Sequence, residues 1–387
     1  MLCWILAPTL LLASASPGAT PSRPRPELMD AIETLRSTGL NGLNSEPATQ
    51  AWKQLAKLDV SDLPHLLAAM DGANDVARNW LRSAIDPVLD RARAEKKKLP
   101  LSELEAFLAD RRHDPQSRRF AYELIVEADA HAPDRILPGM LDDPSQDMRR
   151  DAVARLLDEA NKTLAAGKKD QALALYQQCL AAAREKDQID KTATKLKELG
   201  QPVDIARHYG FIQDWKLVGP FPNPSQNGIE TAYPPEKQID LNAAYNGKAG
   251  KIRWKDHVTS AENGKVDLKQ VIGKQPDAIA YAMTEFTSDR EQPAEVRIAS
   301  ITALKAWLNG ELALARYDAF TGIRMDSYIA KVRLKKGKNV LLLKLCKDAP
   351  PELRLDTWWF QARVCDDMGA AILSSTRPSS PPSAKNP

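Results

Sequence analysis

The dipeptide Asn309-Gly310 constrains the fold of the C-terminal half of this 387-residue chain more than any other feature. It joins two mostly apolar runs, residues 304–308 and 311–315. Asn and Gly tolerate the positive φ that both central residues of a two-residue type I′ turn require. The pattern therefore predicts a β-hairpin with its tip at Asn309-Gly310, and it indicates a β fold for this half of the chain.

The composition changes at about Tyr209 and divides the chain into a helical part and a β part. Before this point Ala, Leu, Glu, Arg and Lys dominate, and apolar residues recur at helical spacing. Beyond it β-branched and aromatic residues become frequent, and five of the eight tryptophans lie there. We predict a multidomain α plus β protein, with an α-helical repeat domain over residues 27–207 and an antiparallel β-sandwich over residues 208–372. The predicted strands are residues 215–218, 251–254, 278–287, 295–299, 304–308, 311–315, 327–334, 339–345 and 357–364.

The helical part carries a weak internal repeat. Asp71, Asp114-Pro115 and Asp143-Pro144 each precede a helix that contains Arg and Ala. Asp suits the N-cap of such a helix and Pro suits its first turn. These copies resemble HEAT repeats. Residues 152–200, which contain a tight Gly-Lys-Lys-Asp turn and a third helix ending at Gly200, resemble a tetratricopeptide-type hairpin. Both resemblances imply stacked antiparallel helices, in an α-solenoid or an irregular bundle.

Side chains alternate between two faces along each predicted strand, and several strands pair an apolar face with a polar and aromatic one. A tryptophan beside hydrogen-bonding side chains suits a sugar, because the ring stacks on pyranose C–H groups while the polar groups bind hydroxyls. The residues on such faces, and hence the candidate ligand residues, are Trp307, Lys305, Trp359, Gln361, Arg363 and Lys344. The alternative is that loops or the helical domain cover these tryptophans.

Five segments of the β part occur in an order that resembles the galactose-binding-like jelly roll. They are Trp215-Lys216-Leu217-Val218-Gly219-Pro220-Phe221, Tyr233-Pro234-Pro235-Glu236, Ile279-Ala280-Tyr281-Ala282, Trp307-Leu308-Asn309-Gly310 and the stretch 334–344 around Gly337-Lys338-Asn339. This fold occurs in carbohydrate-binding modules and in sugar-binding domains that accompany glycoside hydrolases. The resemblance covers about residues 210–370. It implies sugar binding as the usual activity, while many members of the family serve only as structural spacers.

The N-terminal end of the chain predicts export. Residues 2–12 are apolar, Ala13-Ser14-Ala15 follows, and such a run is shorter than the roughly 20 residues that a membrane-spanning helix needs. We predict a signal peptide at 1–15, although its start lacks Lys and Arg, and a buried N-terminal helix is the alternative. The mature protein would be extracytoplasmic, periplasmic or secreted, with no membrane span. Residues 16–26 are predicted to form a flexible leader, and residues 373–387 a disordered Ser/Pro-rich tail.

Three cysteines, Cys179, Cys346 and Cys365, lie beyond the predicted signal peptide. Cys346 and Cys365 end two successive predicted strands, so an antiparallel pairing would place them at opposite ends of the ladder. Cys179 lies far away in the helical part. We therefore expect no structural disulfide.

The sequence contains no common catalytic, nucleotide-binding or metal-binding motif. The five histidines are scattered without ligand spacing, and no dense Asp/Asn loop marks a calcium site. We expect no metal and no cofactor. The net charge of +3 gives no general signature of nucleic-acid binding. Five cations, all within residues 331–338, make one hairpin basic; a solvated strand edge that resists strand addition explains it, and contact with an anionic polymer is the alternative.

Together these features predict an exported, non-enzymatic binding protein whose β-sandwich contacts carbohydrate or packs on another protein. A first alternative is a protein-interaction scaffold in which the helical domain binds and the sandwich is structural. A second is an accessory part of a polysaccharide-processing system, or an undetected hydrolase, because sequence alone does not exclude a pair of carboxylates at glycosidase spacing.

Overall fold

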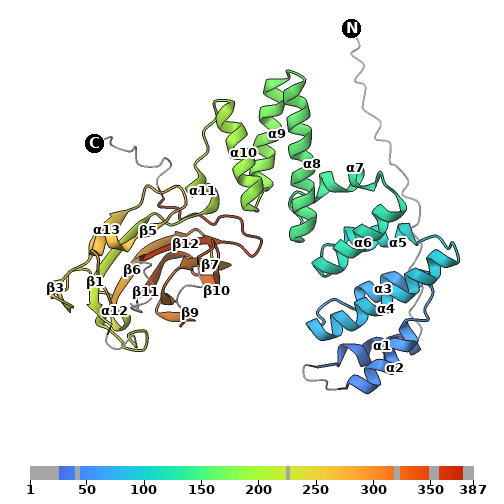
Figure 1. Ribbon diagram of the computed structural model, residues 1–387, viewed down its shortest axis with the longest axis horizontal. Coiled ribbons are helices and arrows are strands. Elements are labelled where there is room, and N and C mark those ends of the chain that lie inside the picture. The colour runs from blue at the N-terminus through green and yellow to red at the C-terminus, as the bar shows by residue number, and fades with distance from the viewer. Residues whose placement is uncertain (1–25, 40–43, 224–226, 318–322, 348–356, 378–387) are drawn as a thin grey trace, which may run out of the picture. The chain divides into compact units, whose positions relative to one another are not determined.

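A computed structural model describes residues 26–39, 44–223, 227–317, 323–347 and 357–377 of the chain (Figure 1). It contains thirteen α-helices, mostly in the N-terminal part, and antiparallel sheets in the C-terminal part. The chain divides into two compact units after Ala152. The predicted signal peptide and the leader up to residue 25 lie outside the described residues.

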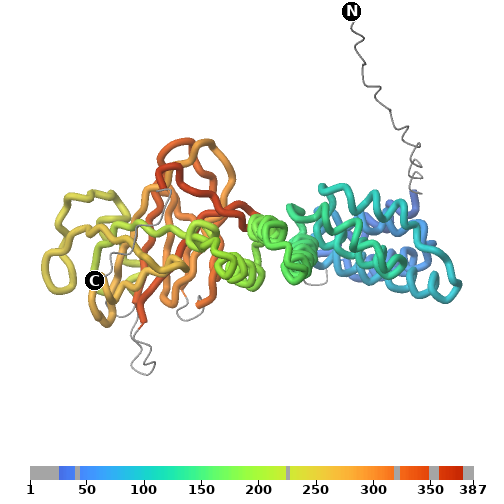
Figure 2. The backbone as a smooth tube through the Cα atoms, turned by 90° about the horizontal axis from the view of Figure 1, so that it is seen from above, coloured from blue at the N-terminus to red at the C-terminus, as the bar shows by residue number. Residues whose placement is uncertain are grey.

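The first unit consists of helices that pack side by side in chain order (Figures 1 and 2). They are α1 (Pro26–Arg36), α2 (Ser45–Leu55), α3 (Leu63–Ala68), α4 (Asp75–Ala94), α5 (Leu101–Ala109), α6 (Pro115–Ala128) and α7 (Ala132–Ile136), with 3-10 turns at Val60–Asp62 and Leu137–Met140. Helix α8 (Gln146–Ala165) contains the point of division. The unit boundary therefore lies inside a helix rather than at the composition change near Tyr209.

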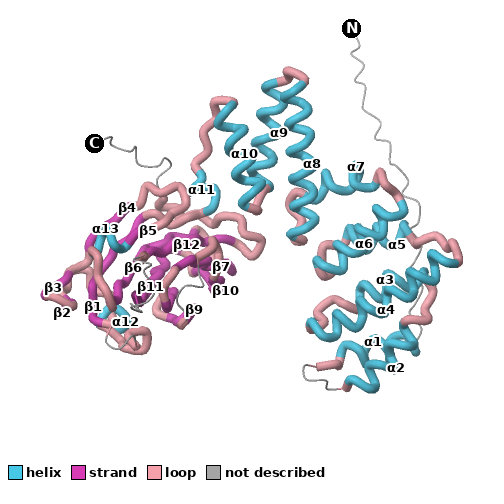
Figure 3. The backbone as a smooth tube through the Cα atoms, viewed as in Figure 1, coloured by secondary structure: helices cyan, strands magenta, loops and turns pink. Residues whose placement is uncertain are grey.

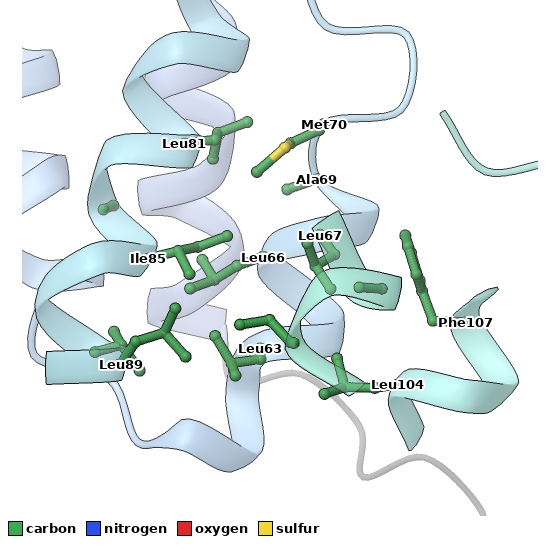
Figure 4. Packing of buried hydrophobic residues seen from close by; sticks show 14 of the residues in the cluster. Leu63, Leu66, Leu67, Ala69, Met70, Leu81, Ile85, Leu89, Leu104 and Phe107 are labelled. Carbon is green, nitrogen blue, oxygen red and sulfur yellow. The ribbon is translucent and has the colours of Figure 1, made fainter. Parts of the chain in front are cut away.

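Apolar residues at helical spacing form the core of the first unit, as helical periodicity requires. On α4 the side chains of Leu81, Ile85 and Leu89 are buried on one face. Ile85 and Leu89 lie beside Leu66 and Leu63 of α3, and Leu81 lies beside Met70, all in the same cluster (Figure 4). These contacts join α3 and α4, which are two of the helices expected from the internal repeat.

The aspartates of that repeat act at helix starts in different ways. The Asp114 carboxylate accepts the backbone N–H groups of Gln116 and Ser117, so it caps α6 as predicted. Asp71 differs, because Asn74 caps α4. The Asp71 carboxylate instead accepts the backbone N–H of Asp114 at 2.7 Å. This aspartate therefore links the segment between α3 and α4 to the start of α6.

The second unit begins with the remainder of α8 and three more helices, α9 (Lys169–Ala182), α10 (Lys186–Glu198) and α11 (Ile205–Tyr209). Gly167 and Gly200 have φ of 77° and 83°, which only residues that tolerate the left-handed region adopt readily. The predicted helical hairpin with its glycine turn is confirmed, as is the third helix, which ends just before Gly200.

The rest of the second unit is built on antiparallel sheets (Figure 3). The strand order is β4-β1-β6-β11-β8-β9 in a six-stranded sheet and β10-β7-β12-β5 in a four-stranded sheet, with β2-β3 as a small ribbon. The strands are β1 (Asp214–Pro222), β2 (Tyr245–Gly247), β3 (Gly250–Ile252), β4 (Lys255–Val258), β5 (Val266–Asp267), β6 (Ala278–Ser288), β7 (Gln292–Ser300), β8 (Ala303–Leu308), β9 (Glu311–Arg316), β10 (Tyr328–Leu334), β11 (Gly337–Lys347) and β12 (Trp359–Cys365). Short helices α12 (Pro234–Lys237) and α13 (Leu268–Ile272) lie in the connections.

Every predicted strand coincides with a strand of the structure to within a few residues, and the hairpin at Asn309-Gly310 is confirmed. Asn309 and Gly310 have φ of 54° and 85°, as a type I′ turn requires. Strands β2, β4 and β5 were not predicted, because they are short and carry mostly polar or exposed residues. The apolar faces of the two larger sheets share one core, to which β8 contributes Leu304 and β12 contributes Phe360.

Residues within 373–377, predicted as the start of a disordered tail, are hydrogen-bonded to β6 and to the segment that leads into β1. The Ser374 hydroxyl accepts the backbone N–H of Thr287 at 2.9 Å. Arg377 donates to the Phe211 carbonyl at 2.8 Å and to the Gln213 side chain at 2.9 Å. Side-chain hydroxyl and guanidinium groups thus fix a segment whose composition alone indicated disorder. Residues 378–387 of the predicted tail lie outside the described residues.

Cys179, Cys346 and Cys365 are buried, and none of them is in a disulfide among the described residues. Burial raises the pKa of Cys179 to about 12 and that of Cys365 to about 11. Among the helices in the described part of the chain, none combines the length and the apolar character that crossing a membrane requires.

Candidate functional site

The structure places the six candidate ligand residues on two different sheets. Lys305 and Trp307 lie on β8 and Lys344 on the adjacent strand β11, where Lys344 pairs directly with Lys305. Trp359, Gln361 and Arg363 lie on β12 of the four-stranded sheet. Because the two sheets share their apolar faces, the two groups of residues lie on opposite outer surfaces and do not form one site.

Lys344 is fully buried and bonded within the protein. Its ammonium group donates to the Glu236 carboxylate at 2.7 Å and to the carbonyls of Ile229 and Thr231 at 3.1 and 2.7 Å. The Tyr281 hydroxyl donates to the same carboxylate. Burial, together with this hydrogen bond to Glu236, raises the Tyr281 pKa far above its usual range. Lys344 therefore holds the segment that follows β1 against the six-stranded sheet, and it has no donor left for a ligand.

Glu236 and Tyr281 are important residues of this cluster that the sequence analysis did not select. Both lie in segments quoted for the galactose-binding-like resemblance. The signal in the sequence that could have pointed to Glu236 was Lys344, a lysine in an apolar strand. A buried ammonium group needs a carboxylate partner.

The polar residues of β12 are also bonded internally. Arg363 is 3% exposed and binds Asp326 with a 2.8 Å bond from Nε, while Nη1 donates to the carbonyls of Tyr209 and Gly369 at 3.1 Å each. Gln361 is 8% exposed and donates to the carbonyl of Asn263. Trp359 is partly exposed, and the Lys265 ammonium lies 4.6 Å from its ring centroid. Loops therefore cover most of this surface, which was the alternative considered from the sequence.

Aromatic and charged side chains remain accessible along the edge of the six-stranded sheet that β8 and β9 form. The segment between β1 and β4 covers the middle of the outer face through residues such as Ile229 and Tyr245. On β8, Trp307 and Lys305 are partly exposed. Leu312 and Tyr317 are 56% and 59% exposed. We call the surface formed by Lys305, Trp307, Leu312, Tyr317 and Glu230 the β8–β9 face.

Ionic and aromatic contacts order the β8–β9 face. The Lys305 ammonium lies 3.2 Å from the Glu230 carboxylate and 5.8 Å from the centroid of the Tyr317 ring. Hydrogen bonds from Lys305 and Tyr317 hold the Glu230 pKa below its usual value. Glu230 is thus an ionised acceptor beside a cationic donor, and Tyr317 supplies a ring next to both.

Strand register separates the two aromatic side chains along the β8–β9 face. Trp307 pairs with Leu312, whereas Tyr317 directly follows Arg316, the partner of Leu304. The rows that contain the two rings are therefore about 13 Å apart along the strands, at about 3.3 Å per residue. Lys305 lies between them. The β8–β9 face can accept hydrogen bonds, donate them and offer two stacking surfaces.

Within the described ranges, no three His, Cys, Asp or Glu side chains gather closely enough to hold a metal ion. Burial lowers the pKa of His257, and burial with the Arg184 charge lowers that of His208 to about 4. Both imidazoles are therefore neutral near pH 7, and they lie in separate parts of the second unit.

Comparisons with known proteins return no relative that defines the family. No protein-family profile matches the sequence, and no curated protein matches it significantly. The solved structures that resemble parts of the chain include glycoside hydrolases. A β-glucosidase from Kluyveromyces marxianus in complex with glucose aligns over 28% of this chain and 14% of its own, at 17% identity and a TM-score of 0.23.

A β-glucuronidase from Faecalibacterium prausnitzii aligns over 35% of this chain and 21% of its own, at 15% identity and a TM-score of 0.20. The alkylpurine DNA glycosylase AlkC of Pseudomonas fluorescens, bound to DNA with an abasic site analogue, aligns over 89% of this chain and 94% of its own, at 12% identity and a TM-score of 0.19. The chain thus spans only 14% and 21% of the two glycoside hydrolases. At TM-scores this low, none of these similarities bears on what the chain does.

Proposed function

We propose that the two-sheet part of this protein is a galactose-binding-like jelly roll that binds carbohydrate through its β8–β9 face. The protein as a whole would be an exported, non-enzymatic binding protein whose helices form a HEAT- and tetratricopeptide-like solenoid. Support comes from the segment order of the β part and from the composition of the β8–β9 face. The N-terminal apolar run supports export.

The observation that carries the proposal is the arrangement around Lys305. Two aromatic side chains, Trp307 and Tyr317, flank an ion pair between Lys305 and Glu230 on an accessible surface. Aromatic rings stack on the C–H faces of sugars, and charged donors and acceptors bind hydroxyls more strongly than neutral groups do. Of the six residues selected from the sequence, Lys305 and Trp307 therefore remain suitable as ligand residues, and Tyr317, Glu230 and Leu312 join them.

The test is binding of the full chain to a glycan array, followed by titration of the best glycan. Tyr317→Ala and Trp307→Ala should each weaken binding about tenfold, because each removes a stacking surface. Trp359→Ala is the matched control, since it removes a partly exposed ring from the opposite sheet and should leave the affinity unchanged. Thermal unfolding of each variant confirms that the fold is intact. Binding that survives loss of both Trp307 and Tyr317, or that Trp359→Ala alone abolishes, contradicts the proposal.

A protein-interaction scaffold is the second candidate function. It is favoured by a pocket of about 500 Å³ in the first unit, beside the connection between α4 and α5. Leu89, Leu99 and Leu101 contribute apolar lining, and Arg93 and Lys97 contribute charge. This candidate replaces the first if no glycan binds the full chain, and if the wild type binds one defined protein partner more tightly than Leu99→Ser does.

A further inference from the structure

A groove runs between the outermost strands of the two sheets. Its volume is about 410 Å³, and it is lined by Leu308, Asn309, Glu311, Leu312, Ala313, Lys331, Val332, Arg333 and Lys335. Among the described strands, β9 ends the six-stranded sheet and β10 ends the four-stranded sheet. One side of each strand therefore presents backbone N–H and C=O groups that no ladder uses, and these groups can bind hydroxyls.

The charge of the groove is unbalanced. Lys331, Arg333 and Lys335 line it, against Glu311 as the acidic lining residue. The Arg333 guanidinium lies 2.7 Å from the Glu291 carboxylate. In the described part of the chain, neither Lys331 nor Lys335 makes an ion pair of 4.0 Å or less. The two ammonium groups are thus available for an anionic ligand.

Lys331 has one acidic neighbour in the sheet, and that neighbour is already bonded. Lys331 pairs across the ladder with Glu295 of β7. Arg297 binds the Glu295 carboxylate at 2.7 Å. Glu295 is 7% exposed, so it adds little negative charge to the surface near the groove.

The groove continues the β8–β9 face. Leu312 lines the groove and also pairs with Trp307 across the β8–β9 ladder. Its side chain is 56% exposed, so it lies at the surface where the β8–β9 face and the groove meet. A chain of sugar rings that rests on Trp307 and Tyr317 can therefore extend over Leu312 toward Lys331 and Lys335.

We propose that this groove selects acidic polysaccharide, with Lys331 and Lys335 binding the carboxylates of successive uronic acid residues. The inference rests on the proposed function, because it names the class of glycan that the β8–β9 face would take. Leu312 contacts the apolar face of a sugar ring, the free strand edges bind its hydroxyls, and the two lysines neutralise its carboxylates.

The groove suits an acidic sugar better than it suits a nucleic acid. Its own lining contains no aromatic side chain, and the rings of Trp307 and Tyr317 on the adjoining β8–β9 face would have to stack the bases instead. The chain has a net charge of +3, which does not produce the general basic field that phosphate backbones attract. A second explanation for the lysines is protection of the strand edges from pairing with other chains. The test must therefore separate binding from aggregation.

The experiment measures the affinity of the full chain for hexagalacturonate and for its neutral methyl ester by calorimetry. The acid should bind at least about tenfold more tightly at low salt, and this advantage should shrink as salt is added. Lys331→Gln and Lys335→Gln should each reduce the affinity for the acid about fivefold, since each removes one charge-assisted contact. Binding of the methyl ester should not change.

Lys336→Gln is the matched control, because Lys336 is an exposed lysine of the same hairpin that does not line the groove. It should retain the preference for the acid. Sedimentation of each variant shows whether loss of binding comes with aggregation.

The outcomes are distinct. Equal affinity for acid and ester, with both weakened by Trp307→Ala, overturns the groove inference and leaves the proposed function standing. If neither the acid, nor its methyl ester, nor any arrayed glycan binds, both the groove inference and the proposed function are overturned. Tighter binding of a single-stranded oligonucleotide that depends on the same two lysines overturns the inference in favour of a nucleic acid. Aggregation of the lysine variants without any effect on glycan affinity shows that the lysines only protect the strand edges.

Discussion

Lys344 and Arg363 show how single polar side chains fasten connecting segments onto the sheets. Lys344 is fully buried, and its three hydrogen bonds join β11 to the segment that contains Glu236. Arg363 joins β12 to Asp326 and to the carbonyl of Tyr209 at the end of α11. A buried charge is tolerated only when its donors are satisfied, so these partners are required for the fold.

Protonation of His208 provides a prediction at the residue scale. Burial and the Arg184 charge lower its pKa from 6.5 to about 4, so the folded state favours the neutral ring. Between these two pH values the unfolded chain binds a proton that the folded chain does not. Stability should therefore fall as the pH drops from 6.5 to 4. In His208→Gln the fall in unfolding free energy between pH 6.5 and pH 4 should be about 1–2 kcal/mol smaller than in the wild type, allowing for the partial exposure of the ring.

The measurement is the free energy of unfolding by denaturant at several pH values, for the wild type and for His208→Gln. An identical slope of stability against pH in the two proteins would show that His208 binds its proton equally in the folded and unfolded states.

Two asparagines connect neighbouring turns at the scale of elements. Asn309, at the tip of the β8–β9 hairpin, accepts the backbone N–H of Val340 at 2.9 Å and donates to the Asn339 side chain at 2.9 Å. Asn339 is fully buried and also bonds the backbone of Lys335 and Gly337. The β8–β9 hairpin and the turn between β10 and β11 are therefore held as one structure.

Asn339→Ala should destabilise the protein by about 3 kcal/mol, because it leaves several buried backbone and side-chain groups without partners. Asn246→Ala is the control, since Asn246 is exposed on β2, and its effect should stay within about 0.5 kcal/mol. Denaturant unfolding of both variants measures the difference. Equal effects from the two substitutions would refute a connecting role for Asn339.

At the scale of the whole molecule, the chain contains two compact units with separate cores. The first unit depends on a buried ion pair in which Arg118 donates to both carboxylate oxygens of Asp143 at 2.8 and 2.7 Å. Neither side chain is exposed to solvent. Since the sheets have their own core, damage to this pair should affect the first unit alone.

Arg118→Ala should destabilise the first unit by about 3–5 kcal/mol, because it leaves the buried Asp143 carboxylate with only the more distant Arg111 guanidinium, at 3.8 Å, as a cation. Hydrogen exchange of the full chain should then show lost protection in α5 and α6, while β6 and β11 keep theirs. Arg112→Ala removes an arginine whose side chain is 90% exposed and should change neither region. Equal loss of protection in the strands would show that the two units unfold together.

Features that short-range interactions decide followed from the sequence, whereas features that contacts between distant residues decide did not. Local patterns predicted the hairpin at Asn309-Gly310 and the helix cap at Asp114 correctly, because backbone geometry and neighbouring N–H groups decide them. Alternation along β12 placed Gln361 and Arg363 correctly on one face. It did not show that loops cover that face, because residues distant in sequence, such as Asp326 and Asn263, make the contacts.

The sequence by itself determined most of the helices and strands, and which side of each predicted strand is apolar, since these properties follow from backbone preference and side-chain periodicity. Only the tertiary structure decided which polar faces meet solvent. It buried Lys344 beneath the segment that contains Glu236 and left Lys305 and Trp307 partly exposed, although Lys305 and Lys344 are direct neighbours across a ladder. The reason is that desolvation of a polar side chain depends on partners brought together by folding, and short-range sequence patterns do not encode their positions.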